Sequence, residues 1–286
     1  MKNKTTKKYD LTEETIAVGL IHTNAPFHLA SDEKDVRHLA ETWVDNKCEN
    51  IFVSFRDGMY WVIEGQKRTL SAKMRFGNEK KLKCFVRRDC KTLADDAQWF
   101  YELNHQKRKF SESTEGYLSR QYFDEDWKNI LDALNKASLT CSYSGSRNDG
   151  SVACLTTLEK IYEDYNNKEN FTNMLILLNN SICGAKESLM ANFLKGFSVF
   201  YKTYNNSIDV KILEKCFVKK DKSAKKQYID LNMFDVIAKD TEKYKSEYSK
   251  IGKAGAQAIR GLYNKTTRKK DKELKLSLLE DVVTTL

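Results

Sequence analysis

The sequence has little proline and no paired cysteine motif. One proline in 286 residues, beside 12 glycines, favours a mostly helical chain, because proline is confined largely to loops and sheet edges. The seven cysteines are odd in number and never spaced Cys-x-x-Cys, and the four histidines do not pair with them at ligand spacing. This pattern argues against a disulfide framework and a zinc site, and it predicts free thiols in a reducing compartment.

Long apolar runs are absent as well. No run approaches the roughly 18 apolar residues of a membrane-spanning helix, so we expect none. The basic start MKNKTTKKYD lacks the apolar segment of a secretory signal. Together these features predict a cytoplasmic protein.

Positive charge is in excess. The formal net charge is +9, which favours polyanionic partners such as nucleic acid, nucleotides or an anionic membrane surface. Simple solubility is the alternative explanation. Because 41% of the residues are hydrophobic, the chain can also bury a real core.

The pattern predicts an α+β chain with two regions and a tail. Residues 12–112 alternate short strands and helices, residues 113–264 are mostly helical, and residues 265–286 form a highly charged tail. We expect strands over 16–21, 51–55 and 59–64, with Asp57-Gly58 as a tight turn. We expect one helix capped by Ser31 or Asp32 and another by Thr92, the latter with Asp95 at capping-box spacing. A short helix is expected over 69–75, and Gly77 ends it.

The junction EGQKRT stands between a strand and a helix, where phosphates are often held. Glycine has no Cβ, so Gly65 lets an anion approach the main chain. Arg68 in the first helical turn can bind phosphate oxygens through two nitrogens, and Thr69 offers a hydroxyl and an acceptable N-cap. Between residues 65 and 91 there are ten Lys or Arg against two acidic residues. The sequence therefore predicts an anion site here, although a strand-ending glycine and solvated cations are the common alternative.

The segment DGMYWVIEGQKRTLSAKMRFGNEKKLKCFV resembles the ParB/sulfiredoxin-like superfamily, which shows Asp-Gly-x-Tyr-x-Val-Ile-x-Gly-x-x-Arg between a strand and a helix. Downstream, ELNHQKRKFS is similar to the second ParB nucleotide motif, Glu-Asn-x-x-Arg. Here Leu103 separates Glu102 from Asn104, and Lys107 or Arg108 stands for the arginine. The helical region is similar to that of ParB-like proteins of phages and mobile elements.

The resemblance implies a small α/β domain that binds a nucleoside triphosphate, CTP or ATP, with Mg²⁺. Asn104 and Glu102 would lie near the metal ion. The residues that would hold the nucleotide are Gly65, Gln66, Lys67, Arg68, Thr69, Asn104, Lys107 and Arg108. Gln66 and Lys67 stand where sulfiredoxin has its cysteine and histidine, which argues against sulfinic acid repair.

Three functions stay open. The first is a ParB-like nucleotide-binding protein that acts on or near DNA, with its basic surface on DNA and its helical half supplying self-association into a homo-oligomer or further DNA contact. The second is an enzyme of the same fold, a nuclease or a phosphotransferase, with Glu64 or Glu102 as base or metal ligand. The third is a partner-binding module without nucleotide turnover. No helix-turn-helix signature is visible, which argues against specific centromere-like binding.

Overall fold

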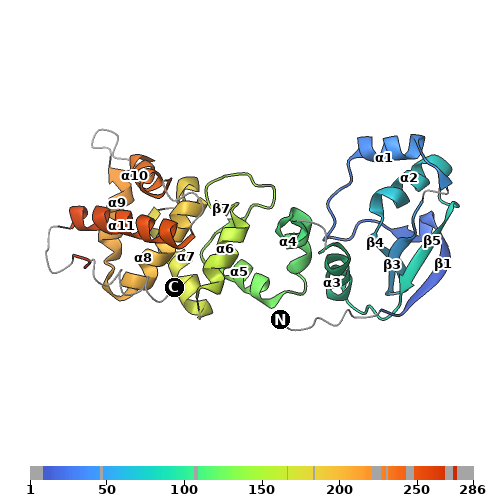
Figure 1. Cartoon of the computed structure of the whole chain (residues 1–286), viewed down its shortest axis with the longest axis horizontal. Coiled ribbons are helices and arrows are strands. Elements are labelled where there is room, and N and C mark those ends of the chain that lie inside the picture. The colour runs from blue at the N-terminus through green and yellow to red at the C-terminus, as the bar shows by residue number, and fades with distance from the viewer. Residues whose placement is uncertain are drawn as a thin grey trace. The chain divides into compact units, whose positions relative to one another are not determined.

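The computed structural model describes residues 9–45, 48–105, 109–165, 167–182, 184–220, 227–229, 231–242, 248–267 and 273–275. The chain divides into two compact units, residues 1–125 and 126–286. The first contains a five-stranded sheet and the second is mainly helical (Figure 1), so the predicted α+β layout is confirmed. Among the helices of the described ranges, none has both the length and the apolar character that crossing a membrane requires.

The first unit places helices on both faces of its sheet. Its strands are β1 (Leu11–Ala17), β2 (Ile21–His22), β3 (Ile51–Arg56), β4 (Met59–Glu64) and β5 (Lys81–Arg87). Its helices are α1 (Glu33–Glu41), α2 (Gln66–Phe76), α3 (Leu93–Asn104) and α4 (Thr114–Arg120), with 3₁₀ turns at Val18–Leu20 and Phe110–Glu112.

The strand order is β1-β5-β3-β4-β2, in which β3 runs parallel to β5 and antiparallel to β4. Side chains alternate between the two faces of the sheet, as the period of a strand requires. Val53 and Val62 join the core under α1 and α2, whereas Phe52 and Ile63 pack against α3. Glu64 ends β4 and Gln66 begins α2, so these two elements meet at one edge of the layered unit.

Local signals in the first unit are confirmed. Asp57 and Gly58 both take positive φ, 55° and 76°, as a tight hairpin turn demands. In the capping box of α3, Asp95 N donates to Thr92 Oγ1 at 3.2 Å, and Thr92 N donates to Asp95 Oδ2 at 2.8 Å. Gly77 ends α2 with φ 80°.

The expected strand over 16–21 is wrong in its bounds. The first strand runs over Leu11–Ala17, and a 3₁₀ turn separates it from the short β2. The turn forms because Val18 N and Gly19 N donate to the carbonyls of Lys80 and Asn78, which pulls the chain out of the strand. A Cβ on Gly19 would lie 2.8 Å from Asn78 Cβ, so this close approach also requires glycine.

The second unit is built from helices with two small two-stranded pieces. Its helices are α5 (Glu125–Lys136, which begins at the boundary), α6 (Leu155–Glu163), α7 (Lys168–Ile182), α8 (Ala191–Tyr204), α9 (Val210–Phe217), α10 (Leu231–Glu242) and α11 (Tyr248–Thr266). Short strands are β6 (Thr140–Cys141), β7 (Ser151–Val152), β8 (Val218–Lys220) and β9 (Gln227–Ile229), and 3₁₀ turns are η4 (Lys186–Leu189) and η5 (Asn205–Ser207).

Helices α8 and α11 cross at two glycines. A Cβ on Gly196 would lie 2.7 Å from Gly255 Cα, and the converse distance is the same, so neither position has room for a side chain. Around this crossing, Phe197, Phe200 and Tyr263 are fully buried. The close approach of the two backbones therefore lies within the core of the second unit.

Part of the charged tail docks on the second unit. Leu274 is 4% exposed, and its N–H donates to Asn264 Oδ1 at 2.9 Å. Tyr204 Oη donates to the Lys275 carbonyl at 2.8 Å. The rest of the predicted tail, residues 276–286, lies outside the described residues.

Candidate anion site at the start of helix α2

The predicted junction forms a left-handed turn that leads directly into a helix. Gly65 has φ 108° and ψ 22° and is the N-cap residue of α2. A Cβ here would lie 3.1 Å from the Ile51 side chain and 3.3 Å from Arg68 Nη2. Both the backbone conformation and the packing therefore require glycine at this position.

Helix α2 begins at Gln66, so the expected start at Thr69 is wrong. Because Gly65 serves as the N-cap, its carbonyl accepts from Thr69 N at 3.0 Å and from Thr69 Oγ1 at 3.1 Å. Thr69 is 1% exposed. The Thr69 hydroxyl donates to the Gly65 carbonyl from within the helix, so it faces the protein rather than solvent.

The first three N–H groups of α2 are open. In the described part of the chain, the N–H groups of Gln66, Lys67 and Arg68 have no hydrogen-bond acceptor. A helix N-terminus carries partial positive charge, and its unpaired N–H groups point out along the axis. The backbone here has the geometry that binds a phosphate or carboxylate.

The Arg68 side chain is used by the protein itself. Its Nη1 donates to the Glu49 carbonyl at 2.9 Å and to the Asn50 carbonyl at 3.5 Å, and it lies 3.7 Å from Glu49 Oε2. The guanidinium therefore fastens the loop before β3 to the Gly65 turn. Arg68 shapes the turn, and its guanidinium is directed at the loop before β3.

The Gln66 amide fastens a second loop. Its Nε2 donates to the Thr23 carbonyl at 2.7 Å, and its Oε1 accepts from Ser31 Oγ at 2.8 Å. Residues 23–31, which connect β2 to α1, are thereby fixed beside the start of α2. Like Arg68, Gln66 positions backbone around the turn.

Lys67 is the exposed cation of the turn. Its Nζ lies 2.5 Å from Asp35 Oδ2, and both side chains are more than half exposed, at 53% and 57%. This hydrogen bond raises the pKa of Lys67 and lowers the pKa of Asp35. An exposed pair of this kind is worth little, so an incoming anion can replace Asp35 as the partner of Lys67.

The structure brings Asn104 to Glu64 at the same edge. Asn104 is the last residue of α3 and is 3% exposed, and its Nδ2 donates to Glu64 Oε2 at 3.1 Å and to the Phe100 carbonyl at 2.9 Å. Glu102 lies two positions earlier on the helix, which turns it to another face, and its Oε1 accepts from Gln98 at 2.9 Å. Glu64 is therefore the carboxylate beside Asn104.

His28 is a neighbour that the sequence did not suggest. Its Nε2 lies 3.2 Å from the Val62 carbonyl, and its ring meets Phe100 edge to face at 4.7 Å. Burial lowers the pKa of His28, against the opposing effects of that carbonyl and of the carboxylates of Glu115 and Glu64. In the sequence, the one sign that His28 lies near the site is its place two residues after Pro26. In the structure, it lies in the loop that Gln66 fixes.

The rest of the second predicted motif is only partly visible. Lys107 and Arg108 lie outside the described residues. His105 Nδ1 lies 2.6 Å from the Glu102 carbonyl, and its ring stacks with Tyr101. Within the described ranges, no group of three or more His, Cys, Asp or Glu is arranged to hold a metal ion by itself.

Comparison with known proteins gives one assignment. The model of a family of unknown function (DUF6551) matches residues 27–269, which include the Gly65 turn and most of the helical unit. No curated protein matches the chain. The chain belongs to the DUF6551 family.

Proposed function

We propose that this member of the DUF6551 family binds a nucleoside triphosphate, CTP or ATP, at the start of α2 and acts on or near DNA. The observation that carries the proposal is the set of three open N–H groups at Gln66, Lys67 and Arg68, which follow the left-handed Gly65. In this proposal a phosphate at these groups adds charge-assisted hydrogen bonds without disturbing a buried contact, and the exposed Lys67 ammonium exchanges Asp35 for it.

In this proposal the residues of the turn have different roles. The backbone of residues 66–68 and the Lys67 side chain bind phosphate oxygens. Gln66 and Arg68 hold the two flanking loops through the carbonyls of Thr23 and Glu49, so they position the site. Gly65 gives the turn its conformation.

In this proposal Glu64 and Asn104 supply oxygen ligands to a magnesium ion that accompanies the nucleotide. Carboxylate and amide oxygens are the ligands that Mg²⁺ prefers, and it keeps several waters and phosphate oxygens in its shell. Asn104 Nδ2 donates to Glu64 Oε2 at 3.1 Å, so the two side chains are neighbours, and Glu64 directly precedes Gly65. When bound, the ion would neutralise phosphate charge. If the nucleotide is turned over, Glu64 is better placed than Glu102 to take part.

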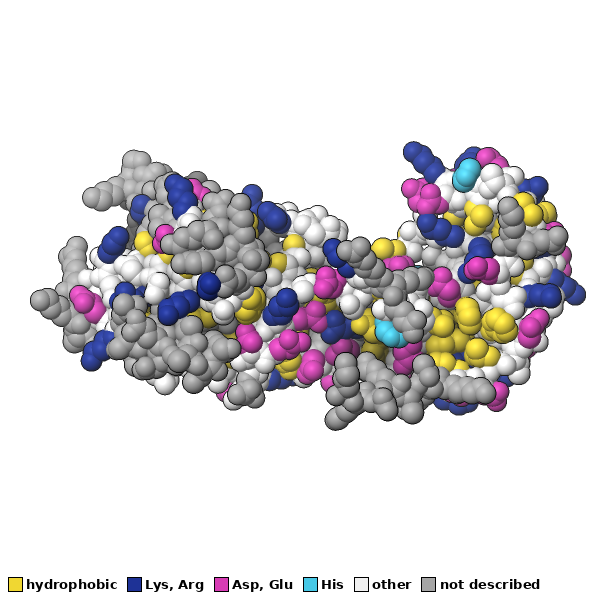
Figure 2. Space-filling view, viewed as in Figure 1, with side chains coloured by type: hydrophobic (Ala, Val, Ile, Leu, Met, Phe, Trp, Pro, Cys, Tyr) yellow, Lys and Arg dark blue, Asp and Glu magenta, His cyan; other side chains and the backbone are white. Residues whose placement is uncertain are grey.

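The DNA contact is proposed from charge. The net charge of +9 supports neutralisation of phosphates by lysine and arginine. On the face seen in Figure 2, Lys and Arg side chains of the described residues are scattered among acidic ones on each unit. Binding of this kind is nonspecific and weakens as salt rises. When a DNA duplex is titrated at several salt concentrations, the logarithm of the affinity should fall linearly with the logarithm of the salt concentration.

One observation favours a second candidate, a partner-binding module that no longer uses a nucleotide. The side chains of Gln66, Arg68 and Thr69 each hydrogen-bond to the protein's own backbone. In such a module the turn would serve only to join two loops to a helix. The two candidates differ in whether any nucleotide binds.

Isothermal titration with CTP, ATP and GTP, each with Mg²⁺, tests the proposal. We expect one of them to bind and Lys67→Met to weaken it about tenfold, which corresponds to about 1.4 kcal/mol. Lys73→Met is the matched control, because Lys73 is an exposed lysine two turns further along α2 and should leave affinity unchanged.

Absence of binding by all three nucleotides would reject the first candidate and favour the partner-binding module. Phosphate release that is lost in Glu64→Gln and kept in Glu102→Gln would add turnover to the proposed function.

A further inference from the structure

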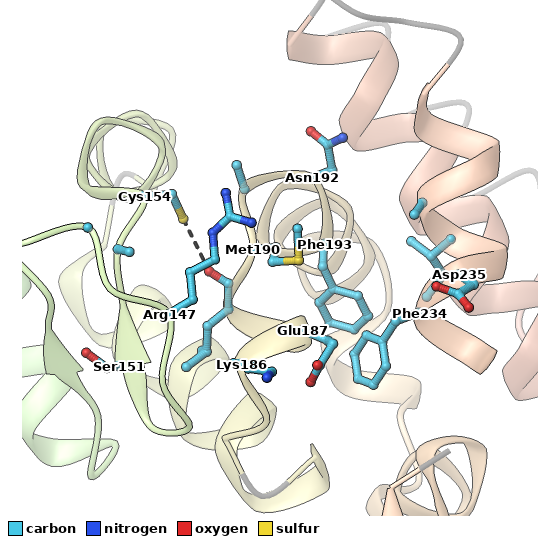
Figure 3. Close-up of a pocket in the computed structure, with 16 residues that line it drawn as sticks. Arg147, Ser151, Cys154, Lys186, Glu187, Met190, Asn192, Phe193, Phe234 and Asp235 are labelled. Atoms are coloured by element: carbon cyan, nitrogen blue, oxygen red, sulfur yellow. Dashed lines mark hydrogen bonds between the residues drawn. The ribbon is translucent and has the colours of Figure 1, made fainter. Parts of the chain in front are cut away.

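The second unit contains a cavity that the proposed function does not use. Its volume is about 430 Å³, within the range of small-molecule sites. It is bounded by the loop between β6 and β7, by η4, by the first turn of α8 and by α10 (Figure 3). All of these elements belong to the second unit.

One wall of the cavity is apolar and aromatic. The rings of Phe193 and Phe234 lie 5.0 Å apart and are 4% and 6% exposed, and they are drawn side by side in Figure 3. Leu189 and Ile237 continue this wall. Such a wall favours a ligand with an apolar or aromatic body.

Cations without carboxylate partners gather near Cys154, which also lines the cavity. Arg147 reaches into the cavity in Figure 3, and Lys195 lies one turn into α8. Both act electrostatically on the Cys154 thiol, although the Lys195 ammonium lies 4.9 Å from the Tyr248 ring and outside the lining of the cavity. Within the described ranges neither makes an ion pair. Burial and the nearby Lys160 lower the pKa of Lys195, as expected where a counter-ion is missing.

Backbone groups reinforce this charge. Met190 gives α8 no side-chain cap, and the N–H groups of residues 191–193 have no acceptor in the described part of the chain. The loop that carries Arg147 is fixed, because Asp149 Oδ1 accepts from Lys186 N at 2.9 Å and Gly150 N donates to the Gly184 carbonyl at 2.7 Å. The cation is therefore supplied by an anchored loop.

The cavity also presents acceptors. The carboxylates of Glu187 and Asp235 line it, and Figure 3 shows both near Phe234. A simple inorganic anion would gain nothing from them. A ligand with an anionic group at one end and N–H donors on an aromatic body would match the cations, the aromatic wall and the carboxylates together.

We propose that this cavity binds a small aromatic anion of the nucleoside monophosphate class. Its phosphate faces Arg147 and the start of α8. Its base packs on Phe193 and Phe234, with amino groups toward the carboxylates. The Cys154 thiol, whose Sγ lies 3.3 Å from the Leu189 carbonyl, is part of the wall and takes no chemical role. The site is separate from the one at α2 and does not depend on it.

Isothermal titration of the full chain with AMP, CMP, GMP and UMP, without Mg²⁺, tests this proposal, with inorganic phosphate as a further arm. We expect one nucleotide to bind more tightly than inorganic phosphate. Arg147→Gln should weaken it about tenfold, through loss of a charge-assisted contact. Ala238→Phe, which fills the cavity from an exposed position on α10, should abolish it.

Two controls keep the sites distinct. Lys211→Gln removes an exposed cation on α9 of the same unit and should change nothing. Lys67→Met damages the α2 site and should also leave monophosphate binding intact. Binding lost in Lys67→Met but kept in Arg147→Gln would overturn the proposal, as would no binding of any monophosphate at millimolar concentration. If Ala238→Phe fails to fold by circular dichroism, Arg147→Gln decides alone.

Discussion

The two units differ in how they use polar side chains around their candidate anion sites. At the start of α2, the side chains of Gln66, Arg68 and Asn104 are all bonded to protein atoms, so the open groups are mainly backbone N–H. In the helical unit, Arg147 lines a cavity directly, and neither it nor the neighbouring Lys195 makes an ion pair within the described ranges. Arg68, which belongs to the predicted motif, thus shapes the main chain, whereas Arg147, which no motif marked, stays available to a ligand.

Glycine has different roles in the two units as well. Gly65 is required by its positive φ and by its contact with Ile51. Gly196 and Gly255 have ordinary helical conformations and are required because two backbones touch. Substitutions can therefore separate the cost of conformation from the cost of contact.

The largest effect is expected at the helix crossing. Gly196→Ala places a Cβ 2.7 Å from the backbone of Gly255, which cannot move aside without separating α8 from α11. We expect a loss of about 3 kcal/mol in the free energy of unfolding, measured by urea denaturation. Gly261→Ala on α11 meets no atom within 4 Å and should be neutral or slightly stabilising. Equal stabilities for the two variants would contradict the close crossing.

A smaller loss is expected at the turn of the first unit. Gly65→Ala combines a strained left-handed conformation with contact to Ile51, for a cost of about 2 kcal/mol. Gly58→Ala is the control, because its φ is 76° and no atom lies within 4 Å, so only the conformational cost of about 1 kcal/mol applies. In thermal or urea unfolding, Gly65→Ala should be less stable than Gly58→Ala. The reverse order of stability would show that packing against Ile51 is unimportant.

Arg68 and Lys67 should separate stability from binding. Arg68→Met removes the hydrogen bonds to the carbonyls of Glu49 and Asn50, and we expect about 1.5 kcal/mol of destabilisation. Lys67→Met should leave stability within about 0.5 kcal/mol, since its pair with Asp35 is exposed. Unfolding curves of both variants check this. A stable Arg68→Met that loses nucleotide affinity would mean that the arginine binds phosphate after all.

The smallest effect is a pH dependence from His28. Its pKa in the folded chain is below the ordinary value of 6.5 because burial disfavours the charged ring, so the unfolded chain binds the proton more readily. Its contribution to stability is present above 6.5 and is lost as the pH falls through the folded pKa. His28→Gln should flatten the fall in unfolding free energy on the acid side of neutrality, and His38→Gln, on the exposed face of α1, should not.

Features encoded within a few residues could be predicted from the sequence. The Asp57-Gly58 turn, the Thr92 capping box and the Gly77 stop depend on neighbouring residues alone, and each is present. The strand bounds near Gly19 could not be predicted, because Lys80 and Asn78 end that strand from about 60 residues away.

The same limit applies to the candidate site. The sequence placed Gly65 and Lys67 at a strand-to-helix junction, but it could not show that Arg68 reaches back to Glu49. The contact between Glu64 and Asn104 spans 40 positions and arises only when α3 packs on the sheet. The cavity of the second unit had no sequence signal beyond a glycine- and serine-rich loop.

The most direct test of the central claim is an amide-resolved NMR titration of the full chain with the magnesium complexes of CTP and ATP. If the backbone at the start of α2 binds phosphate, the amide signals of Gln66, Lys67 and Arg68 will shift most, and Lys67→Met will reduce the shifts while Lys73→Met will not. Unchanged signals for these three amides at saturating nucleotide would contradict the account.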